Sequence, residues 1–567
     1  MKKKLLSLLM LIIPMLTFAQ EKGLDQQIDE AFKPISDFFS NVIFFLIYNG
    51  ESIKIPFVLV LLVVSAAFFT IYFGFPNIRH FFTAINVVRG KYEDIEKHGA
   101  QLLYGEDGIA RGVDMNKVDD IEEYIENIES LHSDLEIDGD IKDTIRDESQ
   151  EGEVSHFQAL ATAVSGTVGN GNIAGVALAI ALGGPGATFW MIVCGLLGMS
   201  TKFVECTLGV HYRDVGKDGT IYGGPMYYLS KGLKEKGFAM LGKISAILFA
   251  IFCIGGSFGG GNAAQSNQAT IVIKELLGLE STAAGAIIGL ILAIVVGVII
   301  IGGIKRIATV TEKVVPFMAI LYILACLYII FINFSLLDDA FVLIIREAFK
   351  PTSIAVGGII GVLLQGFKRA AFSNEAGAGS ASIAHSAVKT KYSASEGLVA
   401  LLEPFIDTVV ICTMTALVII IFNFGGAFEY GGDGTGSVFI DGVAYEGAGI
   451  TSKAFAQYIP FSNIFLTVAV VLFAVSTMIS WSYYGLQSWK FLFGRGKKAD
   501  LTYKILFLTF VVIGAAASMR SIWDFSDAMI FAMVFPNMVG LYLLMPVVKK
   551  QLKRYVDAIN LKKEAIE

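Results

Sequence analysis

The stretch SGTVGNGNIAG, from Ser165 to Gly175, interrupts an apolar run that extends over residues 157–182. Its four glycines and two asparagines make a poor helix, because each glycine costs about 1 kcal/mol relative to alanine in a helix interior. Irregular backbone inside a membrane is tolerated only where protein or a water-filled cavity satisfies its polar groups. Gly171 and Gly175 alone would also fit a small-residue packing motif, but packing does not need the asparagines. The stretch therefore predicts a broken membrane helix at a functional site.

A second interruption, QGFKRAAFSNEAGAGS, runs from Gln365 to Ser380 and begins five apolar segments after the first. An odd number of helices per half places the two halves, 154–350 and 351–548, in opposite orientations, as a 5+5 inverted repeat. Interrupted helices at matching positions of inverted halves indicate a midplane binding site in a secondary transporter. A channel or a receptor does not require this pairing.

The composition assigns the whole chain to the membrane. Hydrophobic residues make up 54% of the 567 residues and charged residues only 17%, with a mean hydropathy of +0.63. A soluble domain carries about 25% charged residues, so a soluble enzyme, a nucleic-acid binder and a disordered scaffold are excluded. Apolar blocks of about 20 residues predict an all-α polytopic membrane protein. Eleven spans are expected, over residues 54–73, 157–182, 187–210, 239–268, 283–302, 308–333, 353–372, 397–423, 460–484, 504–520 and 526–547. The span at 54–73 is additional to the ten spans of the repeat.

Basic residues predict the orientation. Lys2 to Lys4 precede a short apolar run that ends at Ala19, which is typical of a signal peptide over residues 1–19. Cleavage there leaves residues 20–53 as an external N-terminal segment. Short loops rich in Lys and Arg face the cytoplasm, and with an external N-terminus the inner segments hold 24 Lys and Arg and the outer ones 8. We therefore expect a multi-pass protein of the plasma (inner) membrane, with a cytoplasmic tail at 549–567.

An acidic block interrupts the basic cytoplasmic side. Residues 91–153 hold 21 acidic and 6 basic side chains, a net charge of −15. Residues 54–98 are expected to form the first span and a cytoplasmic amphipathic segment, and residues 99–153 an acidic insert. Within the insert, residues 118–135 have apolar side chains at helical spacing. A solvated helical insertion and a regulatory or partner-binding element both fit this pattern.

Several long motifs resemble one family. SHFQALATAVSGTVGNGNIAGVALAIALGGPGATFWM from Ser155, GMSTKFVECTLGVHYR from Gly198 and FSNEAGAGSASIAH from Phe372 are similar to motifs of the bacterial alanine or glycine:cation symporters. The resemblance covers residues 54–98 and 154–550. It implies a LeuT-type fold and inward transport of a neutral amino acid down a sodium gradient. The acidic insert and the cleavable N-terminus depart from the usual pattern of the family.

The first break suits a zwitterionic amino acid. The N-terminal end of a broken half-helix offers free N–H groups and a positive dipole end to the carboxylate. Carbonyl groups freed near Gly366 and Phe367, together with amide side chains such as Gln265, could hold the ammonium group. An interhelical hydrogen bond is the alternative role of Gln265. The candidate substrate-binding residues are Thr167, Gly169, Asn170, Gly171, Asn172, Gln265, Gly366, Phe367, Asn374 and Trp481.

The resemblance also implies a sodium site. In LeuT-type proteins a Ser/Thr pair joins carbonyl groups of the first broken helix to bind the ion. Ser476 and Thr477 match that pair, and the carbonyl groups of Ser165 and Val168 complete the candidate ligands. Without the resemblance, hydroxyls bonded back to their own helix would be the commoner role.

Charged residues within the spans have structural alternatives. Glu403 and Asp407 share a helix face and could bind a cation or a proton, or pair with Lys or Arg of a neighbouring helix. Lys202 is expected to pair with Glu205. Glu375 could form an inner gate with Lys368 and Arg369, or a structural ion network. The five cysteines form no CxxC pair and are expected to be small buried hydrophobes.

These features predict a sodium-coupled symporter for alanine, glycine or both, embedded in the lipid bilayer. No enzymatic activity, organic cofactor or nucleic-acid partner is expected. A proton-coupled symporter, or a symporter of another small solute with the same fold, is the nearest alternative. A gated channel or a solute-sensing receptor is a more distant one.

Overall fold

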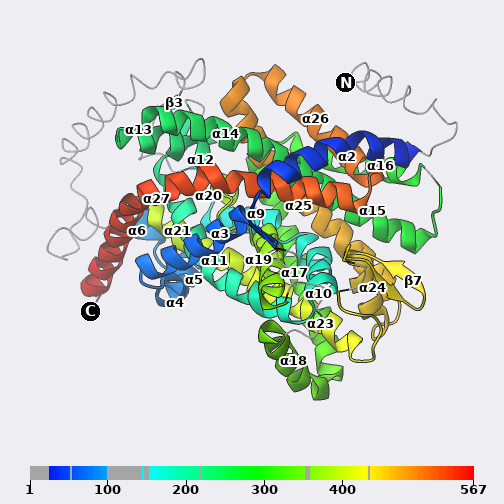
Figure 1. Ribbon diagram of the computed structural model, residues 1–567. Coiled ribbons are helices and arrows are strands. Elements are labelled where there is room, and N and C mark those ends of the chain that lie inside the picture. The colour runs from blue at the N-terminus through cyan, green and yellow to red at the C-terminus, as the bar shows by residue number, and fades with distance from the viewer. Residues whose placement is uncertain are drawn as a thin grey trace, which may run out of the picture.

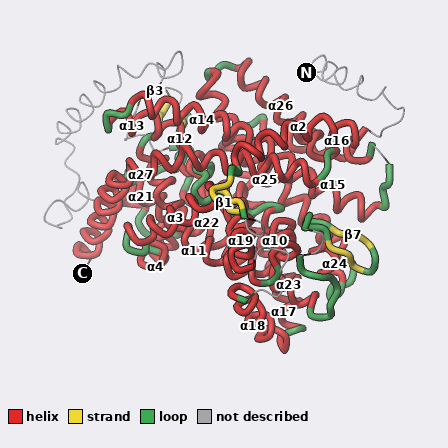
Figure 2. The backbone as a smooth tube through the Cα atoms, in the orientation of Figure 1, coloured by secondary structure: helices red, strands yellow, loops and turns green. Residues whose placement is uncertain are grey.

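The computed structural model describes residues 24–50, 54–98, 144–145, 152–216, 220–281, 283–350, 358–431 and 434–566. The predicted signal peptide and nearly all of the acidic insert lie outside these residues. Helices dominate the described part, whose strands form two short pairs and one short three-stranded sheet (Figures 1 and 2). One large cluster of buried apolar side chains joins the two halves of the chain.

The N-terminal region contains more regular structure than the sequence indicated. Its elements are α2 (Leu24–Ile43), β1 (Leu46–Asn49), β2 (Lys54–Pro56), α3 (Phe57–Tyr72), α4 (Pro76–Arg79), α5 (Phe81–Val88), α6 (Glu93–His98) and β3 (Thr144–Ile145). Strands β1 and β2 form an antiparallel hairpin before the first predicted span. Helix α2 lies along the C-terminal helix (Figure 1).

The first half begins with the broken helix. Its elements are α9 (His156–Thr167), η2 (Gly171–Gly175), α10 (Val176–Gly183), α11 (Gly186–His211), β4 (Asp214–Gly216), β5 (Ile221–Tyr222), α12 (Pro225–Tyr227), η3 (Tyr228–Gly232), α13 (Leu233–Glu235), α14 (Ala239–Phe258), η4 (Gly259–Ala263), α15 (Ala264–Leu277), α16 (Ala284–Ile300), α17 (Gly303–Ile332), η5 (Phe334–Leu336) and α18 (Leu337–Phe349). The segments η2, η3 and η4 are π-helical turns, which often occur at functional sites.

The second half of the chain also contains an interrupted helix. Its elements are α19 (Gly358–Asn374), α20 (Ala381–His385), α21 (Ser393–Ala400), α22 (Leu402–Pro404), the π-helical η7 (Phe405–Cys412), α23 (Thr413–Asn423), β6 (Val438–Ile440), β7 (Val443–Tyr445), α24 (Ala448–Ala456), α25 (Ser462–Phe493), α26 (Lys497–Ala516) and α27 (Met519–Ile566). The antiparallel pair β6–β7 confirms the hairpin that its Gly-rich sequence suggests.

Each of the eleven predicted spans coincides with a helix. Seven continuous helical segments are long and apolar enough to cross a membrane, and the bent pair of α9 with residues 171–183 makes an eighth. Helices α3 and α16 are apolar but shorter, and α19 has 17 residues. The protein is therefore a mostly helical, multi-pass membrane protein.

The first predicted break is confirmed. Helix α9 ends at Thr167, and the chain resumes as η2 with a bend of 51° between the two halves. Ser155 begins α9 with a capping box, in which its hydroxyl accepts from Gln158 N–H and the Gln158 side chain accepts from Ser155 N–H.

The second break lies in the C-terminal part of the predicted stretch, Gln365 to Ser380. Helix α19 continues without interruption through Gly366 and Phe367 to Asn374, so the expectation of freed carbonyl groups at those two residues is wrong. The chain leaves the helix at Glu375, whose φ of 56° is in the left-handed region, and Gly377 and Gly379 follow with φ of 94° and 87°. The glycines that break the helix are therefore those of the EAGAG stretch, because glycine adopts positive φ without steric cost.

Candidate functional site

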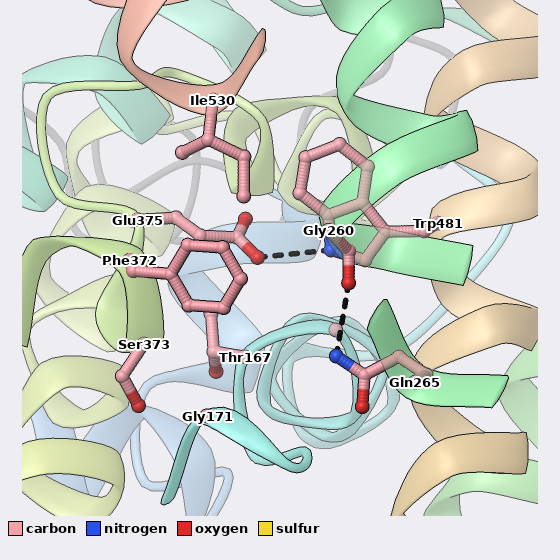
Figure 3. A pocket seen from close by; sticks show the side chains of 10 residues that line it. Thr167, Gly171, Gly260, Gln265, Phe372, Ser373, Glu375, Trp481 and Ile530 are labelled. Carbon is pink, nitrogen blue, oxygen red and sulfur yellow. Dashed lines mark hydrogen bonds between the residues drawn. The ribbon is translucent and has the colours of Figure 1, made fainter. Parts of the chain in front are cut away.

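A small cavity lies where the two interrupted helices meet α25 and η4. Figure 3 shows its walls, which come from Gly166, Thr167, Gly171, Gly260, Gln265, Phe372, Ser373, Glu375, Trp481 and Ile530. The space among these side chains, counted together with the part that is open to its surroundings, is about 220 Å³.

Trp481 is held in a fixed position at one wall. Its Nε1 donates a hydrogen bond of 2.9 Å to Glu375 Oε1, and the other carboxylate oxygen accepts from the Ser380 hydroxyl (Figure 3). On the opposite side, a Cβ added at Gly261 would lie 2.1 Å from the indole Cγ. The absence of a side chain at Gly261 thus leaves space for the indole, and Glu375 fixes the orientation of the indole.

Gln265 connects the cavity to the first break. Its Oε1 accepts from Asn170 N–H at 3.0 Å, and its Nε2 donates to the Gly260 carbonyl at 2.9 Å. Asn170 Nδ2 in turn donates to the Gln265 carbonyl at 3.2 Å. The Oδ1 atom of Asn170 is buried and accepts no hydrogen bond within the described residues. The interhelical hydrogen bond considered for Gln265 is therefore present, and its side chain also lines the cavity, while its role toward the ammonium group stays a prediction.

The candidate sodium ligands lie directly behind this wall. Thr477 Oγ1 donates to the Ser165 carbonyl at 3.0 Å, and Ser165 Oγ donates to the Ser476 carbonyl at 2.8 Å. The Ser476 hydroxyl instead bonds back to Phe473 O at 3.0 Å. Helix α9 ends next to this group at Val168, so its last carbonyl groups present the negative end of the helix dipole. Oxygen atoms at such an end suit a hard monovalent cation.

Other candidate residues lie away from the cavity wall. Asn172 Nδ2 donates to Asp407 Oδ1 at 2.6 Å, and Asn374 Nδ2 donates to Thr408 Oγ1 at 3.0 Å. A Cβ at Gly366 would meet the Ala187 carbonyl at 2.6 Å, so this glycine allows α19 to pack closely against α11. Of the ten substrate candidates, the structure places Thr167, Gly171, Gln265 and Trp481 in the wall, with Gly169 and Asn170 adjoining it.

The buried charges pair differently from the expectation. Lys202 bonds Glu403 at 3.0 Å and not Glu205, whose Oε1 accepts from Asn537 Nδ2 at 2.7 Å. Glu403 is therefore paired with a lysine of a neighbouring helix, which was one of its two predicted roles.

The expected gate between Glu375 and the two basic residues of α19 is also wrong. Lys368 and Arg369 both pair with Asp527 of α27. Glu375 instead bonds Trp481 and Ser380. The five cysteines are free and buried, as expected.

Sequence reasoning did not include several residues of the wall. Ser373 and Glu375 follow within ten residues of Gly366, and a register shift along the same motif would have found them. Ile530 comes from an ordinary apolar segment of α27, and no local signal distinguishes it. The buried Tyr484 hydroxyl lies near pocket-lining Gly166, because a Cβ built there would be 2.9 Å from it.

A family model described as the sodium:alanine symporter family matches residues 136–567. The chain belongs to the sodium:alanine symporter family. The sodium/alanine symporter AgcS of Methanococcus maripaludis is 42% identical over 72% of this chain and 86% of its own length. The probable sodium/glutamine symporter GlnT of Bacillus subtilis is 36% identical over 71% of this chain and 78% of its own length. Family membership identifies the chain as a secondary symporter and not an enzyme.

Among solved structures, MhsT in complex with L-phenylalanine is similar with a TM-score of 0.47 and 14% sequence identity. The similarity covers 73% of this chain and 99% of that one.

Proposed function

We propose that this protein couples the inward movement of sodium to uptake of alanine, glycine or both. The carrying observation is the cavity formed by both helix breaks, with the Ser165–Thr477 oxygen pair directly behind it. The proposal places the substrate carboxylate at the N–H groups around Gly169 and Gly171. It places sodium at the C-terminal end of α9, where Ser165, Val168 and Thr477 supply oxygen atoms.

The walls support a small substrate. Phe372, Trp481 and Ile530 bound the cavity with bulky apolar groups, and the hydrogen bond to Glu375 keeps the indole from turning away. A side chain longer than a methyl group would have to displace one of these groups. Alanine and glycine meet this requirement, whereas glutamine, named for one relative, does not.

The packing of α2 supports the proposed orientation with an external N-terminus. Asp25 accepts from Gly285 N–H at 3.2 Å, and Asp29 accepts from Ser518 N–H at 3.0 Å. Both contacts involve segments that the distribution of Lys and Arg assigns to the outer side. The proposed architecture is a LeuT-type 5+5 inverted repeat that alternates between two openings, with α3 as the additional span.

Uptake into proteoliposomes tests the function. Radiolabelled alanine should accumulate above its external concentration under an inward sodium gradient, and unlabelled glycine should compete while leucine and glutamine should not. Potassium in place of sodium is the control. A channel would only equilibrate alanine, and a receptor would bind it without flux. Accumulation driven by a pH gradient without sodium would favour the proton-coupled alternative.

A further inference from the structure

Six ionisable side chains form a continuous row at the end of α9 opposite to the cavity. Each comes from a different element, and the row is named here the charge ladder. In order it consists of Glu96 (α6), His156 (α9), Glu396 (α21), His385 (α20), Glu403 (α22) and Lys202 (α11). All except His156 are buried. The proposed transport site does not use any of them.

Both histidines of the ladder lie between two carboxylates. His156 contacts Glu96 through Nε2 and Glu396 through Nδ1. His385 Nδ1 lies 2.5 Å from Glu396, and its Nε2 lies 3.5 Å from Glu403. A neutral imidazole has one N–H, so it can donate to only one of two carboxylates, whereas a protonated imidazolium donates to both. The two contacts of His156 therefore require the imidazolium form. His385 donates to Glu396 through Nδ1, and its Nε2 lies within ion-pair distance of Glu403 without a hydrogen bond, so the two carboxylates favour its positive form by charge.

Protonation also balances the charge. With both histidines positive, the six groups alternate in sign from Glu96 to Lys202 and sum to zero. Loss of one proton leaves a net negative charge among buried groups, and an uncompensated buried charge is strongly destabilising. Within the described residues no group of three or more His, Cys, Asp or Glu side chains converges on a metal position. The proton is therefore the ligand that fits this site.

The neighbouring elements place other charged and titratable groups near the ladder. Tyr555 of α27 donates to Glu96 at 2.5 Å, and Glu312 of α17 accepts from Gln158 one turn into α9. Other charged groups on the elements around the ladder include Glu93, Asp94 and Lys97 (α6), Glu205 (α11), Asp407 (η7), Glu375 after α19, Lys490 (α25), Lys562 (α27), and Arg213, which donates to the Ser386 carbonyl after α20. Most of these groups are acids, so they add to the cost of losing a proton from the ladder.

The ladder clamps the half-helix that forms the floor of the cavity. His156 is the first residue of α9 and Thr167, which lines the cavity, is its last. Eleven residues of helix separate them by about 16 Å. A solute that leaves the cavity at this end requires α9 to move away from α6 and α21, which breaks both contacts of His156. Water then reaches the imidazole, whose pKa in water is about 6.5, so it releases its proton at neutral pH.

We propose that the charge ladder is a proton-binding latch that closes the cytoplasmic side of the transporter. The proposal rests on the proposed function and orientation. Internal protons bind the closed state more tightly than the open state, so they shift the population towards closure. The proton is a regulator here and is not carried with the substrate. Acidification of the cytoplasm slows uptake, and alkalinisation relieves the inhibition.

Uptake at controlled internal pH tests the latch. Proteoliposomes are loaded at pH values from 5.5 to 8.5 with a constant external pH and sodium gradient. Alanine uptake by the parent protein should fall by up to about tenfold for each unit of internal acidification, the limit for linkage to a single proton. His156→Gln and Glu396→Gln should flatten this profile. His80→Gln, which lies outside the ladder, is the matched control and should retain the parent profile.

A second measurement does not depend on transport. Hydrogen exchange of the α9 amides in purified protein, corrected for the intrinsic effect of pH, should show protection that decreases as pH rises in the parent but not in His156→Gln. Equal pH profiles in parent and both ladder variants would overturn the latch even if sodium-driven uptake is intact. Net proton entry in proportion to alanine, lost in the ladder variants, would also overturn it, because the ladder would then be a transport pathway. Absence of alanine uptake with pH-dependent protection of α9 would reject the proposed function and keep the latch.

Discussion

Two glycines near the cavity differ in the space that surrounds them. A Cβ at Gly171 would meet Ser373 and Phe372 at 3.5–3.6 Å, which is ordinary van der Waals contact. A Cβ at Gly261 would overlap the ring of Trp481. Gly171 therefore leaves space for the substrate, whereas Gly261 leaves space for the protein. The sequence pattern alone does not distinguish these roles, because both glycines occur in similar Gly-rich stretches.

Gly171→Val should abolish alanine uptake while the protein stays folded. The branched side chain fills space at the cavity wall and hinders approach of a carboxylate to the backbone. Gly171→Ala should fold equally well with weakened uptake, and Gly261→Ala should lower the melting temperature because the indole must move. Uptake assays and thermal unfolding in detergent separate the three. Loss of folded Gly171→Val protein would favour the packing role of this glycine.

Thr477→Val should raise the sodium concentration for half-maximal uptake severalfold, because it removes an oxygen atom from a dry site. Thr477→Ser should restore the parent value. Ser476→Ala should have a smaller effect, since its hydroxyl bonds back to Phe473. Titration of alanine binding against sodium gives the linkage, which typically amounts to 5–150-fold. Equal effects of Thr477→Val and Ser476→Ala on the sodium requirement would contradict the geometry.

Trp481→Ala should allow valine and leucine to compete for uptake, because removal of an indole opens substantial volume. Trp481→Phe should keep most of the selectivity for alanine. Glu375→Gln, which can still accept from Nε1, should lie between them. Competition with each amino acid in proteoliposomes provides the measurement, and an unchanged spectrum in Trp481→Ala would show that the indole does not limit substrate size.

At the scale of elements, sequence located the helices but not every break. Each long apolar segment overlaps a helix, because hydrophobic length is a local property, and seven or eight of the described helices are long and apolar enough to cross a membrane. The break before Gly171 was also predicted, since four glycines and two asparagines leave little choice. The second break was predicted within Gln365 to Ser380, but its freed carbonyl groups were placed near Gly366, whereas the positive φ values lie at Glu375, Gly377 and Gly379. The close packing of Gly366 against α11 is a tertiary contact that no local pattern records.

Helix α2 was assigned only as an external segment, because its packing on α26 and α27 depends on distant residues. Its Asp25 carboxylate accepts from two N–H groups at the start of α16. Burial raises the pKa of Asp25 above its usual range, against the opposing effect of the bond to Gly285 N–H and of Lys274. The protonated form is therefore favoured in the folded protein, and its contribution to stability decreases as pH rises through the raised pKa.

Asp25→Asn should consequently be at least as stable as the parent at pH 8, because the amide keeps an acceptor for Gly285 N–H without a buried charge. The difference should vanish as pH falls below the raised pKa of the carboxyl group. Melting temperatures of the two proteins across this range provide the test. A parent that is more stable at pH 8 would show that the charge at the start of α16 outweighs its burial.

At the scale of the molecule, the acidic insert joins two members of the charge ladder. Glu96 lies three residues before the insert at 99–153, and His156 lies three residues after it. Residues 91–153 carry 21 acidic and 6 basic side chains, a net charge of −15. Sequence predicted this charge but not the ladder, whose six residues are scattered over more than 300 positions.

Replacement of the acidic residues at 114–140 by Asn and Gln should move the inhibition by internal protons to lower pH. A negative surface potential concentrates protons near the ladder, so its removal requires a more acidic interior for the same protonation. The difference between the two proteins should shrink as ionic strength rises, because salt screens the potential within about 8 Å at 0.15 M. If the replacement left the pH profile of uptake unchanged, the charge of the insert would have no influence on protonation of the ladder.

The alternating signs of the ladder have an electrical consequence. An elementary charge that crosses the membrane field does work of about 2.3 kcal/mol per 100 mV. With both histidines protonated, the closed ladder has no net charge. Because His156 lies at the proposed cytoplasmic end of α9, the proton that it releases on opening leaves to the cytoplasm and crosses little of that field. A zwitterionic amino acid is also neutral. Membrane voltage should therefore drive the sodium step alone, and the latch should become voltage-sensitive only when an alkaline interior removes a proton from one of its histidines.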